Sequence, residues 1–313
     1  MTKAQLLERP QIPGPKGLSL FKALLEFART PLEFCLKYPE QYGDIVSLNF
    51  GSTQTYLFSH PDLIDEVLSK HQNSIKDYSY RALQDLFGNG LLLSHGDRWK
   101  YHRRLMQSAF SKDRLATYAE KVVADTDLML ENWRSPERDV HQEMSLLTIK
   151  IIMQAMFGVD ATETAKEIAE ALNTVMLQYY HQAETFYLLP SWLPTPSNLQ
   201  AKRAKQRLDE IVYDIVEERR KIPEADLLSV MLQAKDENGQ QLSSEELRDE
   251  VMTLLIAGHD TTANALTWTL MLLAQNPEVE AKLSAEIELV LSDRLPTIDD
   301  IPQLPYTEMV LKE

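Results

Sequence analysis

The sequence has almost no cysteine, since Cys35 is the only one in 313 residues. A single cysteine cannot form a disulfide within the chain, and it excludes a metal site built from several cysteines. It is also typical of a reducing compartment, so the cytoplasm is the expected location. No neighbouring cation favours a thiolate, and we expect Cys35 to be a small buried side chain without chemistry.

Positive charge and long apolar runs are also scarce. The sequence has 32 Lys and Arg but 47 Asp and Glu, which gives a formal net charge of −15. This charge argues against a general nucleic-acid binder, because phosphate contacts need a surplus of Lys and Arg. No apolar stretch approaches the roughly 20 residues that span a bilayer, and the first residues lack the apolar segment of a signal peptide. With 44% hydrophobic residues, the chain should be globular and bury one large core or two modest ones.

The spacing of apolar residues predicts a mainly α protein with a small β-sheet. Two β-branched and aromatic runs, residues 44–50 and 53–59, flank Gly51 and Ser52 and are typical of a hairpin. This is the only sheet that the sequence clearly predicts. The predicted helices span residues 20–30, 31–43, 61–71, 97–110, 112–134, 140–157, 162–187, 197–221, 225–235, 243–275 and 277–292.

A proline-rich but apolar segment, residues 186–198, separates two of these helices. Side chains such as Phe186 and Leu189 make it unusually apolar for a solvated loop. Two interpretations are open: the segment covers a pocket or touches a membrane, or it packs its own side chains on the core.

The longest predicted helix, residues 243–275, contains unfavourable residues at its middle. It begins with a capping box of Ser243 and Glu246, and a length of roughly 50 Å predicts that it crosses the molecule. Gly258 costs about 1 kcal/mol there relative to alanine. Thr261 can bond back to the carbonyl of Ala257 and weaken the helix locally.

Three interpretations of this feature are open. In the first, Gly258 ends one helix and Asp260 caps the next, without any chemistry. In the second, His259 and Asp260 bind a metal, although neighbouring helix positions point roughly 100° apart and no third ligand is in register. In the third, Gly258 opens room for a ligand, and Asp260 and Thr261 relay protons to it.

The run AGHDTT, residues 257–262, resembles the oxygen-activation motif A/G-G-x-D/E-T-T/S of the cytochrome P-450 family of haem-thiolate monooxygenases. The resemblance implies the fold of that family, in which the long central helix passes over the haem b cofactor. It implies that Ala257 and Gly258 lie against the haem. Asp260 and Thr261 would deliver the protons that cleavage of dioxygen requires.

A second segment carries the same resemblance. Residues 88–110 resemble the part of the family that leads into its W-x-x-x-R helix, with Trp99 and Arg103 at the motif positions, one helical turn apart. An indole N–H and a guanidinium form a donor-only pair suited to a buried carboxylate, which the resemblance identifies as a haem propionate. An isolated motif of this kind is also consistent with a half-buried Trp and a solvated Arg.

Four positive charges lie within seven residues around this motif, at Arg98, Lys100, Arg103 and Arg104. Such a patch suits an acidic partner, and the resemblance implies an electron donor of the ferredoxin or flavodoxin type. The alternatives are a solvated helix face and a nucleic-acid contact. No further basic or aromatic cluster extends the patch towards nucleic-acid binding.

Both ends of the sequence are informative under this resemblance. IPGPKG, residues 12–17, resembles the proline-rich segment ahead of the family's first helices, and only 11 residues precede it, so we expect a soluble, bacterial-type member without a membrane anchor. PYTEMVLKE, which ends at Glu313, resembles the start of the family's E-x-x-R helix. We therefore expect residues 1–313 to be a single incomplete domain, truncated before the cysteine that ligates the haem iron.

These expectations define the predicted function. The complete form would insert one oxygen atom from O2 into a small lipophilic substrate, bound near Leu91, Phe186 and Leu189. This chain contains no predicted metal ligand, because the axial cysteine would follow Glu313, and we expect it to be inactive alone. The alternative is a haem-free helical binding or scaffold protein that holds an apolar ligand beside Gly258.

Overall fold

The structure, a computed structural model, describes residues 11–50, 53–70, 83–135, 137–184, 192–224, 226–235, 239 and 241–313. It is mainly α-helical with one small antiparallel sheet, as the sequence predicts. The chain divides into two compact units, which are described separately. Unit 1 comprises residues 1–76 and 180–193, and unit 2 comprises residues 77–179 and 194–313. The prediction of a single incomplete domain stays a prediction.

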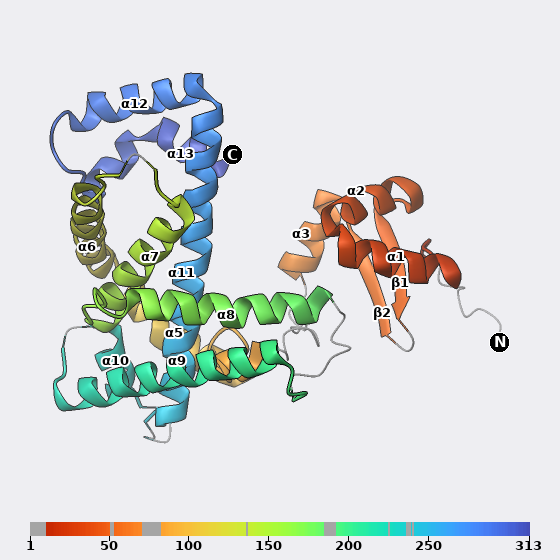
Figure 1. Ribbon diagram of the computed structural model, residues 1–313, viewed down its shortest axis with the longest axis horizontal. Coiled ribbons are helices and arrows are strands. Elements are labelled where there is room, and N and C mark those ends of the chain that lie inside the picture. The colour runs from red at the N-terminus through yellow and green to blue at the C-terminus, as the bar shows by residue number, and fades with distance from the viewer. Residues whose placement is uncertain are drawn as a thin grey trace, which may run out of the picture. The chain divides into compact units, whose positions relative to one another are not determined.

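Unit 1 is built on a pair of helices and a β-hairpin (Figure 1). Helices α1 (Leu18–Arg29) and α2 (Pro31–Tyr42) precede strands β1 (Ile45–Phe50) and β2 (Thr53–Phe58), and α3 (Pro61–Lys70) follows. The strands pair antiparallel, with Ile45 opposite Phe58, so the predicted hairpin is confirmed. The core of this unit consists of Ala23, Phe34, Tyr38, Val46 and Leu48.

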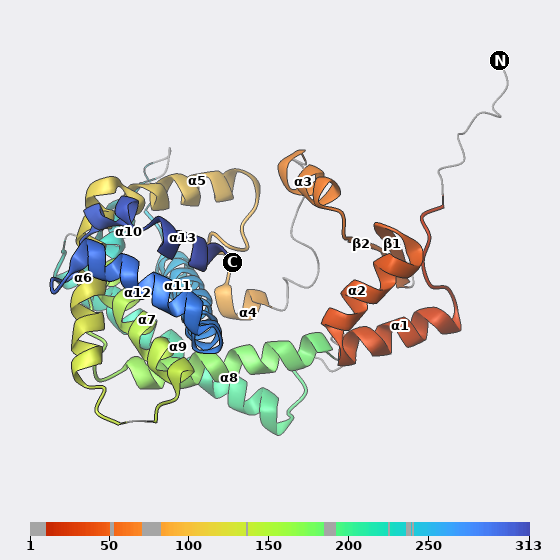
Figure 2. The same ribbon diagram turned by 90° about the horizontal axis from the view of Figure 1, so that it is seen from above.

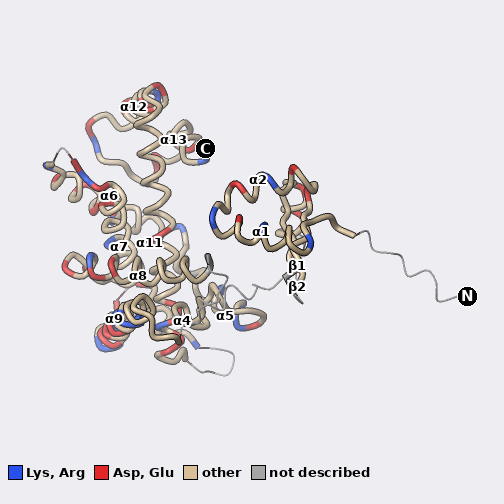
Figure 3. The backbone as a smooth tube through the Cα atoms, turned by 45° about the vertical axis from the view of Figure 1, so that its right-hand side comes forward, with Lys and Arg blue, Asp and Glu red and all other residues tan. Residues whose placement is uncertain are grey.

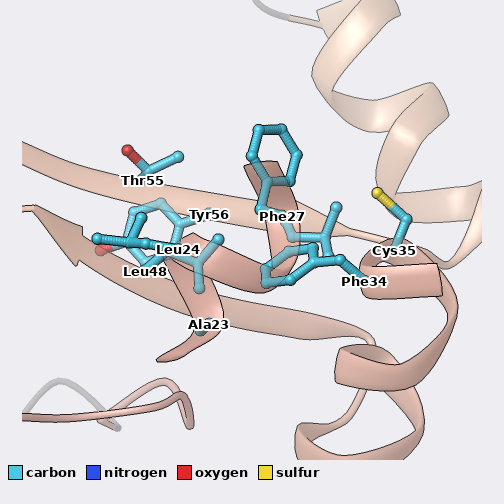
Figure 4. A pocket seen from close by; sticks show the side chains of 9 residues that line it. Ala23, Leu24, Phe27, Phe34, Cys35, Leu48, Thr55 and Tyr56 are labelled. Carbon is cyan, nitrogen blue, oxygen red and sulfur yellow. The ribbon is translucent and has the colours of Figure 1, made fainter. Parts of the chain in front are cut away.

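Cys35 is exposed, and the prediction that it is buried is wrong. The buried face of α2 is occupied by Phe34 and Tyr38, whose rings stack with centroids 4.2 Å apart. Cys35 follows Phe34 directly, about 100° further round the helix, and therefore cannot share that face. Figure 4 shows its side chain at the edge of an apolar pocket of about 210 Å³ formed by α1, α2 and the hairpin.

Unit 2 is a helical assembly around its longest helix, α11 (Ser244–Gln275) (Figure 1). No helix among the described residues of either unit is long and apolar enough to cross a bilayer. Each predicted helix of this unit is observed, with ends that differ by a few residues. The other elements are α4 (Gln84–Phe87), α5 (Gly96–Gln107), η2 (Ser108–Phe110), α6 (Lys112–Glu131), α7 (Val140–Phe157), α8 (Ala165–Glu184), which crosses into unit 1, α9 (Pro196–Lys221), α10 (Leu227–Gln233), α12 (Pro277–Leu291), η3 (Ile298–Gln303) and α13 (Pro305–Lys312).

Helix α11 begins at the predicted capping box. The Ser243 hydroxyl accepts a hydrogen bond from the Glu246 amide at 3.1 Å, and the Glu246 carboxylate accepts one from the Ser243 amide at 2.9 Å. These two bonds satisfy amides that have no partner within the helix. They fix the first residue of α11 and hence the direction in which each later side chain points.

The core of unit 2 surrounds the first half of α11. Helices α7 and α9 lie beside it, as the end-on view of α11 in Figure 2 also shows for α7. Beyond Ile256 the burial becomes one-sided, and Trp268 is 60% exposed. The second half of this helix therefore has an uncovered apolar face. Fully buried side chains of this core include Ile149, Phe157, Leu208, Val212, Leu247, Val251, Met252 and Leu255.

Candidate functional site

The AGHDTT run lies in the middle of an unbroken helix. Because α11 continues from Ser244 to Gln275, Gly258 does not end one helix and Asp260 does not cap another. No cluster of His, Cys, Asp or Glu in the described part of the chain is arranged to hold a metal ion. The Thr261 hydroxyl donates to the Ala257 carbonyl at 2.6 Å, which confirms the predicted back-bond.

Two residues of the run face α7. A Cβ atom at Gly258 would lie 2.5 Å from Cδ1 of Ile152, so the missing side chain lets the two helices approach each other. The room that we expected Gly258 to provide for a ligand is filled by this isoleucine. His259 is also buried, and its Nδ1 lies 2.9 Å from the hydroxyl of Thr148 on α7.

His259 is neutral at physiological pH. Burial lowers its pKa to about 4, against the smaller effect of the nearby Asp260 carboxylate, which raises it. The Thr148 hydroxyl donates its hydrogen to the Met144 carbonyl at 2.8 Å. It therefore accepts from the imidazole, and we assign the ring proton to Nδ1. The histidine of the run joins two helices and does not present a charge.

The opposite side of the run is open. Ala257 and Thr261 are exposed, and Trp268 follows seven residues after Thr261 on the same face of α11. Beyond Thr261 this face borders a hollow of about 550 Å³ whose lining includes Ala265, Trp268 and, from α13, Met309. The site thus combines a hydroxyl with a largely apolar surface, which suits a flat or lipophilic ligand.

Asp260 lies between these two faces and is partly exposed. No described residue donates a hydrogen bond to its carboxylate or pairs with it. Asp260 is the acidic residue of the run, and it lies next to Thr261 in the sequence. A free carboxylate and a hydroxyl at the surface can exchange protons with water.

Trp99 and Arg103 lie together on α5. The Arg103 guanidinium carbon is 5.5 Å from the Trp99 ring centroid, which is a cation–π distance. Both side chains are exposed, Trp99 at 38%, and no described carboxylate pairs with Arg103. The pair therefore presents N–H donors and one uncompensated positive charge to the outside of unit 2.

The basic patch is smaller than the sequence predicts. Arg98 pairs with Glu246 at 3.3 Å and Lys100 with Asp97 at 3.0 Å, whereas Arg103 and Arg104 form no ion pair with a described residue. Figure 3 shows acidic and basic residues interspersed along α9 in the same unit. Two of the four charges are therefore available to a partner.

Of the three predicted pocket residues, the structure describes one. Leu91 is half-buried and packs against the core of unit 2, and its amide donates to Glu250 at 3.1 Å. Phe186 and Leu189 lie outside the described residues.

The sequence analysis missed a buried polar group on α11. Asp249 and Glu250 are buried at 5% and 0% exposure, and Glu250 contacts His102, which is itself 1% exposed. Their position in the sequence could have indicated this burial. The triplet Arg248–Glu250 lies between Leu247 and Val251, in the part of the helix that the apolar pattern places in the core.

Comparisons with known proteins agree with this architecture. The family description "Cytochrome P450" (cytochrome P-450) matches residues 12–313. The chain is 34% identical to cyclooctat-9-en-7-ol 5-monooxygenase of Streptomyces melanosporofaciens, over 98% of this chain and 68% of the relative. It is 35% identical to cyclooctatin synthase of the same organism, over 96% and 67%, and 32% identical to pentalenene oxygenase of Streptomyces avermitilis, over 92% and 65%.

The match extends over nearly the whole chain, and the chain spans about two thirds of the length of these relatives. Two of the three relatives carry the words monooxygenase or oxygenase in their names. The helical architecture, the long central helix with its AGHDTT run and the family match lead to one conclusion: the chain belongs to the cytochrome P-450 family.

Proposed function

We propose that this chain forms the oxygen-activation part of a monooxygenase that inserts one atom of dioxygen into a small lipophilic substrate. The observation that carries the proposal is the exposed face of α11. There Thr261 lies one helical turn before Ala265, which lines the largely apolar hollow, while the Asp260 carboxylate beside it has no described partner. The second oxygen atom would leave as water, so the reaction consumes protons and needs such a relay.

The residues present fit a haem b group. Trp99 and Arg103 present N–H donors and a positive charge that no described carboxylate neutralises, as a propionate requires. The side chain of Ala257 is small, so a flat ring could approach this face of α11 closely. When bound, haem would supply the binding and reduction of dioxygen.

The protein's own groups would then move protons. Asp260 would take protons from solvent water, and Thr261 would pass them inward through its hydroxyl, which already bonds to the Ala257 carbonyl at 2.6 Å. His259 would hold this turn against α7 without competing as an acid, since its pKa is about 4.

The class of substrate and of electron donor is proposed from the side chains at the site and from the names of the relatives. The hollow beside Thr261 is lined mainly by apolar side chains, and relatives are named for oxidation of cyclooctat-9-en-7-ol and pentalenene. We propose a compound of comparable lipophilicity. Arg104, which forms no ion pair with a described residue, would attract an acidic ferredoxin or flavodoxin-type donor in the cytoplasm.

Cys35 would not serve as the haem ligand. It lies on α2 of unit 1 at the edge of an apolar pocket, and none of the described residues that line this pocket is a cation that could stabilise a thiolate. Activity therefore depends on a thiolate that these 313 residues do not supply.

The first test is an absorption spectrum of the purified chain with haem, dithionite and carbon monoxide. It is recorded alone and with a polypeptide covering the C-terminal third of a relative. We expect a red-shifted thiolate band only in the mixture. Absence of haem binding in both would leave a haem-free helical protein that binds an apolar ligand.

Two substitutions with matched controls test the assigned roles. Arg103→Ala should weaken haem binding about tenfold, whereas Arg104→Ala, which changes a neighbouring charge without the Trp99 contact, should not. In the complemented protein Thr261→Ala should divert electrons from product to peroxide or water, and Thr262→Ala should change coupling much less. Equal effects within either pair would contradict the assignment.

A further inference from the structure

A buried carboxylate on α11 contacts two segments that are distant in the sequence. Glu250 has no exposed surface, and burying a carboxylate is costly unless both oxygens are paired. One oxygen contacts Nδ1 of His102 on α5, and the other accepts the Leu91 amide at 3.1 Å. A single side chain therefore links α11, α5 and the segment that precedes α5.

Asp249 extends the same contact. Its carboxylate accepts the Asn89 amide at 2.8 Å and a hydrogen bond from Arg248 at 3.0 Å. Arg248 in turn donates to Asp209 of α9 at 2.7 Å. The two adjacent carboxylates bind alternate amides, at positions 89 and 91, of one short segment.

Two glycines allow the main chain of this segment to lie directly on the helix. A Cβ at Gly88 would lie 2.0 Å from a carboxylate oxygen of Asp249, and one at Gly90 would lie 2.5 Å from the Thr253 hydroxyl and 2.7 Å from the Asp249 carbonyl. Gly88 also has a φ of +56°, where other residues are strained. The sequence GNGL is therefore shaped to fit this turn of α11.

Helix geometry relates the contact to the proposed site. At about 100° per residue, Ala257 and Thr261 each lie within roughly 20° of the direction of Glu250. The face of α11 that is covered at Glu250 by α5 and the Gly88–Leu91 segment is therefore the face that is open at Ala257 and Thr261. On α5, buried His102 directly precedes exposed Arg103. A contact that fixes His102 therefore also fixes the position of Arg103 on the same helix.

We propose that Glu250 is a positioning residue that sets the spacing between the helix of Trp99 and Arg103 and the helix of Asp260 and Thr261. It also fixes the main chain at Leu91 through the amide hydrogen bond. The consequence for ligand binding rests on the proposed function, whereas the positioning itself does not. Asp249 is the second anchor, and within the Gly88–Leu91 segment it binds the Asn89 amide.

The experiment is hydrogen–deuterium exchange of the full chain, followed in a peptide that contains residues 88–94. Glu250→Met removes both hydrogen-bond acceptors at similar volume, and exchange in this peptide should accelerate about tenfold or more, the scale of one hydrogen bond to a charged group. Peptides from α9 and from the β-hairpin should keep the wild-type rate. Glu250→Gln, which keeps an oxygen for the Leu91 amide and an N–H that can bond to the His102 ring, should restore most of the protection.

Thr253→Val is the matched control. Its hydroxyl is buried beside Gly90 and has no hydrogen-bond partner among the described residues, so its removal should leave exchange in the 88–94 peptide unchanged. Should Glu250→Met lose its circular-dichroism spectrum, Glu250→Asp, which retains the charge but is too short to reach both partners, takes its place.

A haem titration, read as quenching of tryptophan fluorescence, gives the second readout. Glu250→Met should weaken haem uptake several-fold, and Glu250→Gln should recover it. Wild-type exchange at residues 88–94 in Glu250→Met, or equal acceleration in α9, would overturn the positioning role. If the wild-type chain takes up no haem, either alone or with the C-terminal polypeptide, the proposed function of this chain fails, while the exchange result still decides the role of Glu250.

Discussion

Helix α11 carries two polar pairs in opposite environments. Asp249 and Glu250 are buried, and each of them accepts a main-chain amide of the Gly88–Leu91 segment. Asp260 and Thr261 lie three turns later, near the surface, where the carboxylate has no described partner. The comparison shows that an acidic residue in this helix is structural where its oxygens are all used and available for chemistry where they are not.

The two regions also differ in what packs on them. The first is covered by α5 and by main chain that two glycines bring close. The second faces α7 with Gly258 and His259, and the face of Ala257 and Thr261 stays open. Removing a partner should therefore be costly at Glu250, whereas a change at Asp260 should be nearly neutral.

The largest expected effect follows from breaking the buried pair. His102→Leu leaves the Glu250 carboxylate buried without its partner and should lower the free energy of unfolding by about 3–5 kcal/mol. Urea unfolding measures the loss. The double variant His102→Leu/Glu250→Leu, which replaces the pair by apolar groups, should recover part of the stability. A single variant as stable as the wild type would contradict the partnership.

A pH effect of similar size should come from His259. The unfolded histidine takes up a proton near its ordinary pKa of 6.5, whereas the folded one does so only near pH 4. The free energy of unfolding should therefore fall by up to ~3 kcal/mol as the pH decreases from about 6.5 to 4. His259→Asn should flatten this slope. His141→Asn, at a nearby exposed histidine, is the control, and an equal flattening there would argue against buried His259 as the cause.

A smaller effect is expected where α11 approaches α7. Gly258→Ala should destabilise the protein by about 1 kcal/mol, because overpacking against Ile152 outweighs the gain in helix propensity. Ile152→Val removes the Cδ1 atom that a Cβ would meet, so the double variant should lose less than the sum of the two single variants. Strict additivity in urea unfolding would show that the close contact does not limit the substitution.

The smallest effect is expected at Asp260, in the exposed region of α11. Asp260→Asn should change the free energy of unfolding by no more than about 0.5 kcal/mol, since a surface substitution without a lost partner has little effect. A loss near that of His102→Leu would mean that Asp260 is held by an interaction in the folded protein, and its role as a free proton donor would fail.

Several features were predictable because they depend on neighbours in the sequence. The capping box at Ser243, the extent of α11, the hairpin and the back-bond of Thr261 all follow from local hydrogen bonding and side-chain periodicity. The stacking of Trp99 on Arg103 follows from one helical turn of spacing. The family resemblance of AGHDTT also rests on contiguous residues.

Other features were decided only when distant segments met. Periodicity shows that Cys35 lies on a helix but not which face that helix buries, and Phe34 and Tyr38 occupy the inner one. Gly258 is a plausible ligand contact until Ile152 is seen against it, and Glu250 is an ordinary charged residue until His102 and the Leu91 amide pair with it. Local propensity determined where the helices begin and end, whereas burial, which depends on what packs against each face, determined which of their polar residues are structural and which are free to act.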